Sequence, residues 1–219
     1  MAVLRFPPVE EADEYGILAV GGDLEVSTLL LAYRSGIFPW PLFGEKYLTW
    51  FAPEKRAVLF LDEFHIGRSL RRELSRADYR IEVNKDFEQV IKSCSELKNR
   101  GDQPGTWITD AMVGAYIDLH QAGFCHSIEC YFEGELAGGL YGVAINRMFA
   151  GESMFYRKPN ASKIALCFLV EYLRVQKVQW IDCQYMTPLF RSFGAREIPR
   201  SEFMTLLNDA LADDVELFR

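Results

Sequence analysis

The chain has 219 residues, of which 49% are hydrophobic and 25% are charged, and its formal net charge is −7. This length allows a buried core in one or two domains, and the composition is that of an ordinary soluble globular protein. The acidic balance argues against a chain coated in nucleic acid, but it leaves room for a local basic patch. No apolar run reaches about 18 residues, so we expect no membrane span.

The first sixty residues are rich in glycine, proline and aromatic side chains. Residues 16–24 indicate a short apolar segment with a turn. Residues 27–35 predict an amphipathic helix that ends at Gly36, and residues 37–43 an aromatic, proline-rich loop. We therefore expect a small N-terminal domain over residues 1–60.

The rest of the chain, residues 61–219, is more regular. Residues 133–134, Glu-Gly, predict a tight hairpin turn, and residues 98–105 a polar loop. Helices are expected at 66–76, 87–97, 109–122, 161–175 and 201–212, and strands at 57–61, 79–83, 125–132, 135–145, 147–153 and 179–183. This order is that of an α+β, acetyltransferase-like (GNAT-like) domain.

Polar side chains end two apolar strand-like stretches. Asp182 and Gln184 close residues 178–185, where the two-residue period of a strand places both on one face. Glu152 lies in a second such stretch, residues 148–155. Because a buried carboxylate is costly without a partner, we expect an acidic pocket that receives a cationic group.

A basic helix face and two tryptophans are candidate contacts for a nucleic acid. Between residues 65 and 80, five arginines stand against two acids: Arg68, Arg71, Arg72, Arg76 and Arg80. The first four share the helix expected at 66–76 and are a candidate phosphate-binding face, although a solvated helix face explains them as well. Trp40 and Trp107 lie in loop-like contexts, where an indole can stack on a base or pack between domains.

Cysteine and histidine spacing gives no metal motif. The five cysteines include no Cys-x-x-Cys pair, and Cys167 and Cys183 lie in apolar runs. We interpret them as reduced thiols of a cytosolic protein and expect no metal site. The turn at residues 156–163 contains no glycine, so its backbone amides are poorly arranged to hold coenzyme A phosphates.

Nine short motifs, taken together and in this order, resemble the bacterial leucyl/phenylalanyl-tRNA–protein transferases: residues 16–24, 32–40, 105–109, 126–129, 138–142, 151–155, 160–163, 181–184 and 194–200. The resemblance implies transfer of Leu or Phe, less readily Met, from aminoacyl-tRNA to proteins that begin with Arg or Lys. It implies that the product carries a signal of the N-degron pathway. No cofactor is implied, and we expect a cytoplasmic monomer.

The resemblance also implies roles for individual residues. Trp40 and Trp107 would hold the terminal adenosine of the tRNA. A pocket for the transferred side chain would be bordered by Phe149, Glu152, Met154 and Leu166, with Tyr33 near the site. Asp182 and Gln184 would orient the acceptor amine and accept its proton, and Glu152 would hold either the acceptor or the donor ammonium.

The chain departs from the family pattern at several positions. Leu189 stands where a histidine is common, which weakens any scheme with a histidine base there. Leu169 and Leu173 stand where some members have phenylalanine. Two other functions remain open at this point: an acyl-coenzyme A-dependent acetyltransferase, and a non-catalytic module that binds tRNA ends or cationic N-termini.

Overall fold

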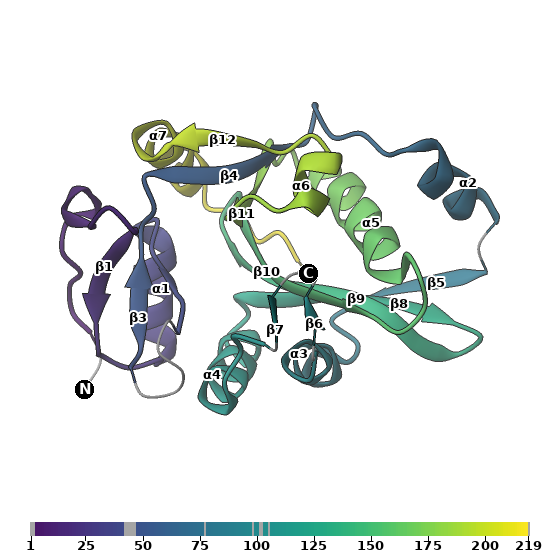
Figure 1. Ribbon diagram of the computed structural model, residues 1–219, viewed down its shortest axis with the longest axis horizontal. Helices are drawn as coiled ribbons and strands as arrows, with labels where there is room; N and C mark the ends of the chain where they lie inside the picture. The colour runs from purple at the N-terminus through teal and green to yellow at the C-terminus, as the bar shows by residue number, and fades with distance from the viewer. Residues whose placement is uncertain are drawn as a thin grey trace.

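The computed structural model describes residues 3–41, 47–76, 78–97, 99–100, 103–104 and 106–218 (Figure 1). The side chain of Arg76, one of the candidate phosphate contacts, lies outside this description, as does Gly105 of the 105–109 motif. None of the helices in the described ranges is long and apolar enough to cross a membrane.

A small N-terminal unit contains a three-stranded antiparallel sheet. Its strand order is β1 (Ile17–Val20), β3 (Thr49–Phe51), β2 (Phe38–Pro39), and helix α1 (Val26–Arg34) follows β1 after a turn. A 3-10 turn, η1 (Val9–Glu11), precedes the sheet. The expected helix is confirmed, and Gly36 has the positive φ of +75° that ends it.

The expectation of an aromatic, proline-rich loop at residues 37–43 is wrong in part, because the segment includes strand β2. Phe38–Pro39 and Thr49–Phe51 pair with each other as strands. Trp50 is 1% exposed and donates its indole N–H to the carbonyl of Gly21 at 2.9 Å. The aromatic residues therefore build the core of the small unit, which proline-rich sequence alone did not indicate.

The larger unit is built on a seven-stranded sheet. Its order is β12 (Arg196–Pro199), β4 (Lys55–Phe60), β11 (Trp180–Gln184), β10 (Met148–Tyr156), β9 (Glu135–Ile145), β8 (Cys125–Phe132), β5 (Tyr79–Val83). All neighbours in this sheet are antiparallel except β10 and β11, which are parallel. The expected α+β class with a small N-terminal unit is confirmed.

Helices cover both faces of this sheet. α3 (Phe87–Ser95) and α4 (Asp110–Gln121) pack on one face, where α1 joins them, and α5 (Ala161–Val175) packs on the other, with α2 (Arg68–Arg76) beside it (Figure 1). Alternate strand residues belong to the two cores: Tyr141 faces the α3–α4 core and Leu140 the α5 core. The five cysteines are all buried, as expected for packing residues.

Long elements matched the sequence better than short ones. α5 has the expected bounds, and Thr109 caps α4 by accepting a hydrogen bond from the amide of Met112 at 3.2 Å. The hairpin turn is formed by Glu133 and Gly134, both with positive φ. Short elements were not foreseen: α6 (Pro188–Ser192), β12, and the two-residue strands β6 (Asn99–Arg100) and β7 (Gln103–Pro104). The closing helix expected at 201–212 is confirmed as α7 (Arg200–Ala212).

The division of the chain at residue 60 stays a prediction. β4, which lies before that boundary, pairs with β11 and β12 in the seven-stranded sheet. By its pairing it therefore counts toward the larger unit.

Candidate active site

The site forms where β10 and β11 separate. They are the only parallel strand pair of the large sheet among the residues that the structure describes. β10 and β11 share one pairing, Ala150 with Asp182. Directly after it both strands become irregular, β10 between Gly151 and Ser153 and β11 between Asp182 and Gln184. Gln184 has a φ of +60°, in the left-handed region. Such irregularities turn side chains away from their regular direction.

The irregular strand ends bring Glu152 and Gln184 together. The side-chain amide of Gln184 donates from Nε2 to Oε1 of Glu152 at 2.9 Å. Tyr33 of α1 donates to Oε1 at 2.7 Å, and Tyr116 of α4 donates to Oε2 at 3.1 Å. Glu152 is 8% exposed. Three separate elements therefore converge on one buried carboxyl group.

Burial raises the pKa of Glu152 to about 7, and the charge of Asp182 adds to this rise. The hydrogen bonds from Tyr33 and Tyr116 and the charge of Arg56 oppose it. The two tyrosine hydroxyls also hydrogen-bond each other. Three contacts thus join the two tyrosine hydroxyls and the carboxyl group of Glu152 in a ring.

The tyrosines themselves remain protonated. Burial raises the pKa values of Tyr33 and Tyr116 well above the usual value, and the charge of Glu152 raises them further. Glu152 is therefore the group of this ring that gains and loses a proton near neutral pH. A buried carboxyl group in this range is suited to general acid–base chemistry.

Asp182 is held differently, in a buried ion pair with Arg56. Nε and Nη2 of Arg56 donate to its two carboxylate oxygens at 2.8 and 2.6 Å. The backbone amide of Gln184 donates to Oδ1 at 2.8 Å. Both oxygens of Asp182 therefore already accept hydrogen bonds. The bond from the amide of Gln184 holds the backbone of that residue in its left-handed conformation.

Sequence reasoning missed two residues of this site, Arg56 and Tyr116. Arg56 is 2% exposed and lies between the rings of Phe38 and Phe203, each centroid 4.5 Å away. An arginine beginning an apolar strand, together with a buried carboxylate in need of a cation, was the available signal. Tyr116 shares the core-facing positions of an ordinary amphipathic helix, so no sequence signal distinguished it.

An aromatic surface adjoins the carboxyl group. Trp40 and Trp107 stack with centroids 5.0 Å apart and an interplanar angle of 15°. The ring of Tyr185, the residue after Gln184, packs edge-to-face with that of Trp40, and their centroids are 5.7 Å apart. Both indoles are half-buried. The structure thus brings the two predicted tryptophans together beside the strand end that carries Gln184.

The apolar residues expected to hold a transferred side chain lie on the α5 face of the sheet. Phe149 and Leu166 are buried, and Met154 packs against the same core. The ring of Phe149 lies over Gly142 of β9, where an added Cβ would stand 2.5 Å from Cζ of Phe149. Gly142 therefore allows β9 to pass beneath this ring.

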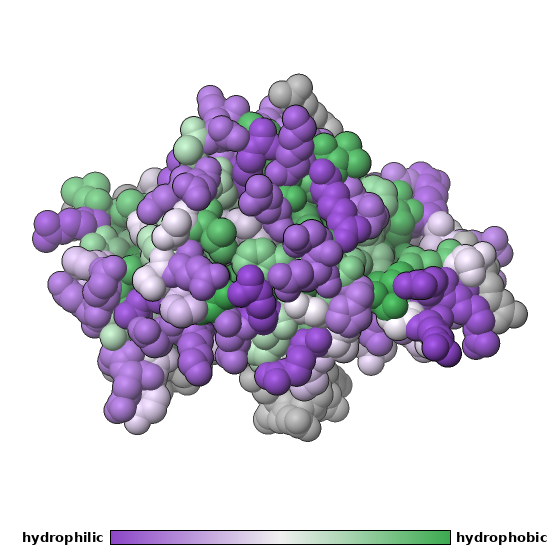
Figure 2. Space-filling view, turned by 90° about the horizontal axis from the view of Figure 1, so that it is seen from above, coloured by the Kyte–Doolittle hydropathy of each residue, from purple (hydrophilic) through white to green (hydrophobic). Residues whose placement is uncertain are grey.

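The arginine face lies on α2. Arg68, Arg71 and Arg72 have exposed side chains, whereas Leu70 turns into the α5 core. Seen from above, strongly hydrophilic side chains gather at this end of the molecule (Figure 2). Arg80, on β5, forms an ion pair with Glu82. Three of the four predicted phosphate contacts are thus shown to be on the surface.

An α+β sheet of this order, with β10 and β11 parallel, has the acetyltransferase-like fold. The fold is shared with the crystal structure of FemX, at a TM-score of 0.54 and 10% identity over 79% of this chain and 66% of that chain. At this identity the likeness concerns the fold alone.

Sequence comparison defines the family. The family model described as leucyl/phenylalanyl-tRNA protein transferase matches residues 58–208, and the model of its N-terminal domain matches residues 22–54. The chain belongs to this family of aminoacyltransferases. It is 47% identical to the leucyl/phenylalanyl-tRNA–protein transferase of Flavobacterium johnsoniae, covering 93% of this chain and 95% of that one. It is 51% identical to that of Nitrosomonas europaea, with 93% and 86% covered.

Proposed function

We propose that this chain transfers Leu or Phe, and less readily Met, from aminoacyl-tRNA to acceptor proteins that begin with Arg or Lys. The observation that carries the proposal is the buried Glu152–Gln184 pair, with a carboxyl pKa of about 7, in a chain of this family. The product would carry a signal of the N-degron pathway, and the enzyme would work as a cytoplasmic monomer without a cofactor.

The reaction is the aminolysis of an ester. The acceptor nitrogen forms a bond to the ester carbonyl carbon, and the bond from that carbon to the tRNA oxygen breaks. The proton lost by the amine ends on that oxygen, which leaves as a hydroxyl group. Since an α-amine has a pKa of about 7.7–8.0, a minority is already neutral at pH 7. Placing the amine against the ester therefore contributes most to the rate, and a general base accelerates the reaction by a further factor of about 10²–10⁴.

The two carboxyl groups have different parts in this proposal. Asp182, already paired with Arg56, holds Gln184, whose Nε2 is directed at Glu152. The carbonyl oxygen of that amide then accepts a hydrogen bond from the incoming amine. Ionised Glu152 attracts the ammonium form and takes its proton. Asp182 and Gln184 thus orient the amine, and Glu152 completes the proton transfer.

The donor is held at its two ends. Trp40 and Trp107 stack on the terminal adenosine, and the side chain enters the apolar surface formed by Phe149, Met154 and Leu166. One methylene group in such a pocket changes the binding free energy by only about 1–3 kcal/mol. Incomplete discrimination among apolar donors is therefore expected. Arg68, Arg71, Arg72 and Arg76 contact tRNA phosphates without reading the sequence.

The test is transfer of labelled Phe from Phe-tRNA, without ATP, to two peptides that differ only in beginning with Arg or Ala. The expected result is label on the Arg peptide alone. A parallel reaction with acetyl-coenzyme A in place of the tRNA tests the acetyltransferase alternative. Bound tRNA without transfer to either peptide would instead support a binding module.

Two substitutions then separate the carboxyl groups. Glu152→Gln removes the proton acceptor and is expected to lower kcat by about 10²–10⁴. Asp182→Asn is expected to lower kcat through misplacement of Gln184 and also to destabilise the fold, because it leaves Arg56 buried without its counter-charge. Full kcat for folded Glu152→Gln would contradict the assignment of the base to Glu152.

A further inference from the structure

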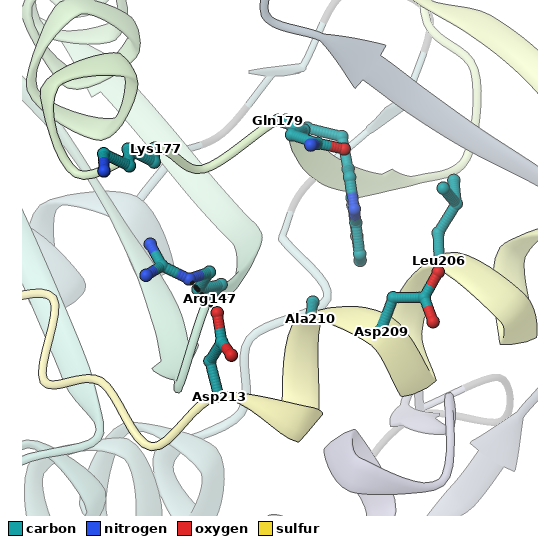
Figure 3. A pocket seen from close by; sticks show the side chains of 8 residues that line it. Arg147, Lys177, Gln179, Leu206, Asp209, Ala210 and Asp213 are labelled. Atoms are coloured by element: carbon teal, nitrogen blue, oxygen red, sulfur yellow. Dashed lines mark hydrogen bonds and ion pairs between the residues drawn. The ribbon is translucent and has the colours of Figure 1, made fainter.

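The segment after α7, residues 213–218, crosses from one face of the sheet to the other. It begins at the hollow of about 310 Å³ shown in Figure 3, where Nε of Arg147 contacts Oδ2 of Asp213 at 2.5 Å. The backbone amide of Arg147 also donates to the carbonyl of Ala210 at 3.1 Å. The turn between β9 and β10 therefore holds the start of this segment.

The end of the segment is buried in the α5 core. Leu217 is 3% and Phe218 is 5% exposed. The hydroxyl of Tyr172 on α5 donates to the carbonyl of Leu217 at 2.9 Å. The ring of Phe218 stacks on His126 at 4.3 Å and on Tyr172 at 5.1 Å. With contacts at both ends, the segment places Phe218 in one defined position.

Phe218 also contacts a residue of the proposed donor pocket. Its ring centroid lies 5.9 Å from that of Phe149. Phe149 is therefore confined between Gly142, which leaves no room for a Cβ beneath the ring, and Phe218. Along β10, Phe149 precedes Glu152 by three residues, or about 10 Å, and Gly151 between them has no side chain.

We propose that Phe218 determines donor specificity by holding the ring of Phe149 and thereby setting the depth of the pocket for the transferred side chain. The proposal rests on the function proposed above, because it needs the donor side chain to lie against Phe149, Met154 and Leu166. Phe218 acts through Phe149 and is a positioning residue. A smaller side chain at 218 lets the Phe149 ring retreat, which deepens the pocket and favours the larger donor.

The experiment compares kcat/KM for Phe-tRNA and Leu-tRNA with one Arg peptide on the same enzyme preparation. The ratio of the two values is independent of the fraction of folded enzyme, so a purely structural role leaves it unchanged. Phe218→Ala is expected to raise the Phe:Leu ratio on the order of tenfold. Phe218→Leu, which keeps more of the packing, is expected to shift the ratio in the same direction by less.

Phe193→Ala is the matched control. Phe193 is 3% exposed in the same core, but its ring contact is with Phe64. This variant is expected to lose stability and to keep the wild-type ratio. A ratio within about twofold of wild type in both Phe218 variants overturns the proposal, as does an equal shift in Phe193→Ala.

A further variant separates the two proposals. If Met154→Ala changes the Phe:Leu ratio while the Phe218 variants do not, the donor pocket stands and the role of Phe218 is wrong. If neither Met154→Ala nor the Phe218 variants change it, both the pocket and the role of Phe218 are wrong. Should Phe218→Ala fail to fold, Phe218→Leu and Phe218→Met carry the test.

Discussion

Glu152 is placed where the requirements of chemistry and of stability oppose each other. Its carboxyl group is buried beneath two tyrosines and an amide, and burial raises its pKa to about 7. A proton acceptor useful at neutral pH requires such a pKa, but the same burial makes the ionised form unfavourable in the folded chain.

The pH dependence of stability follows from this shift. Because the folded pKa of Glu152 exceeds its usual value of 4.5, the proton binds more tightly to the folded chain. The stabilisation is complete below pH 4.5 and is lost as the pH rises through 7, in total about 3 kcal/mol. We therefore expect the free energy of unfolding of Glu152→Gln, relative to that of wild type, to rise by about 3 kcal/mol between pH 4.5 and 8. Urea unfolding at both pH values measures this difference.

The control is Glu197→Gln, which removes an exposed charge from β12. It reports how much of the change comes from net charge alone. If the difference between Glu152→Gln and wild type is the same at pH 5 and pH 8, Glu152 does not carry the shifted pKa.

At the scale of elements, the geometry of β9 and β10 is decided by glycine. Gly138, Gly139 and Gly142 lie on β9 where atoms of β8, β10 or α5 approach within 3.0 Å of the place that a Cβ would take. The glycines of the 138–142 motif therefore allow β9 to be closely packed on both faces. At Gly142 the approaching atoms belong to Phe149 and to the carbonyl of Ala150.

Replacement of glycine by alanine tests this directly. Gly142→Ala is expected to destabilise the protein by about 1–3 kcal/mol, because Phe149 and the β10 backbone must move. Gly114→Ala is the matched control, since Gly114 lies within α4 and nothing stands within 4 Å of its added Cβ. It is expected to stabilise by about 0.5–1 kcal/mol. Thermal or urea unfolding measures both, and equal effects would show that close packing at Gly142 is unimportant.

At the scale of the whole molecule, charge is unevenly distributed. The chain carries −7, yet α2 presents Arg68, Arg71 and Arg72 to solvent. Each lysine or arginine that neutralises a phosphate releases condensed counterions, which makes binding fall steeply with salt. An acidic protein with one basic helix can therefore bind tRNA at that helix while the rest of its surface repels the polyanion.

Replacement of Arg68, Arg71 and Arg72 by alanine tests the basic helix. We expect a higher KM for aminoacyl-tRNA and a plot of log KM against log salt that is flatter by about 2–3 units of slope. kcat at saturating tRNA should remain unchanged. The control replaces three exposed lysines, Lys85, Lys92 and Lys177, and so removes the same charge elsewhere. An equal change in both triple variants would indicate a general charge effect without a defined tRNA face.

Local sequence patterns determined much of this protein. Hydrophobic periodicity and capping residues located α1, α4 and α5, and the strand-end polar residues located Glu152, Asp182 and Gln184, because each pattern depends on neighbours within a few residues. The short strands β2, β3 and β12 depend on pairing partners outside their own residues, so those residues carried little signal. The five-residue helix α6 is too short for a hydrophobic periodicity to show.

The tertiary structure alone decided how the site is assembled. Glu152 and Gln184 meet because two strands separate after a single pairing, and the irregular backbone that turns them inward is invisible in the sequence. Arg56 and Tyr116 join them from elements that look like an ordinary strand and an ordinary helix. A buried carboxyl group takes its partners and its pKa from whatever folds around it, and that environment exists only once distant segments have packed together.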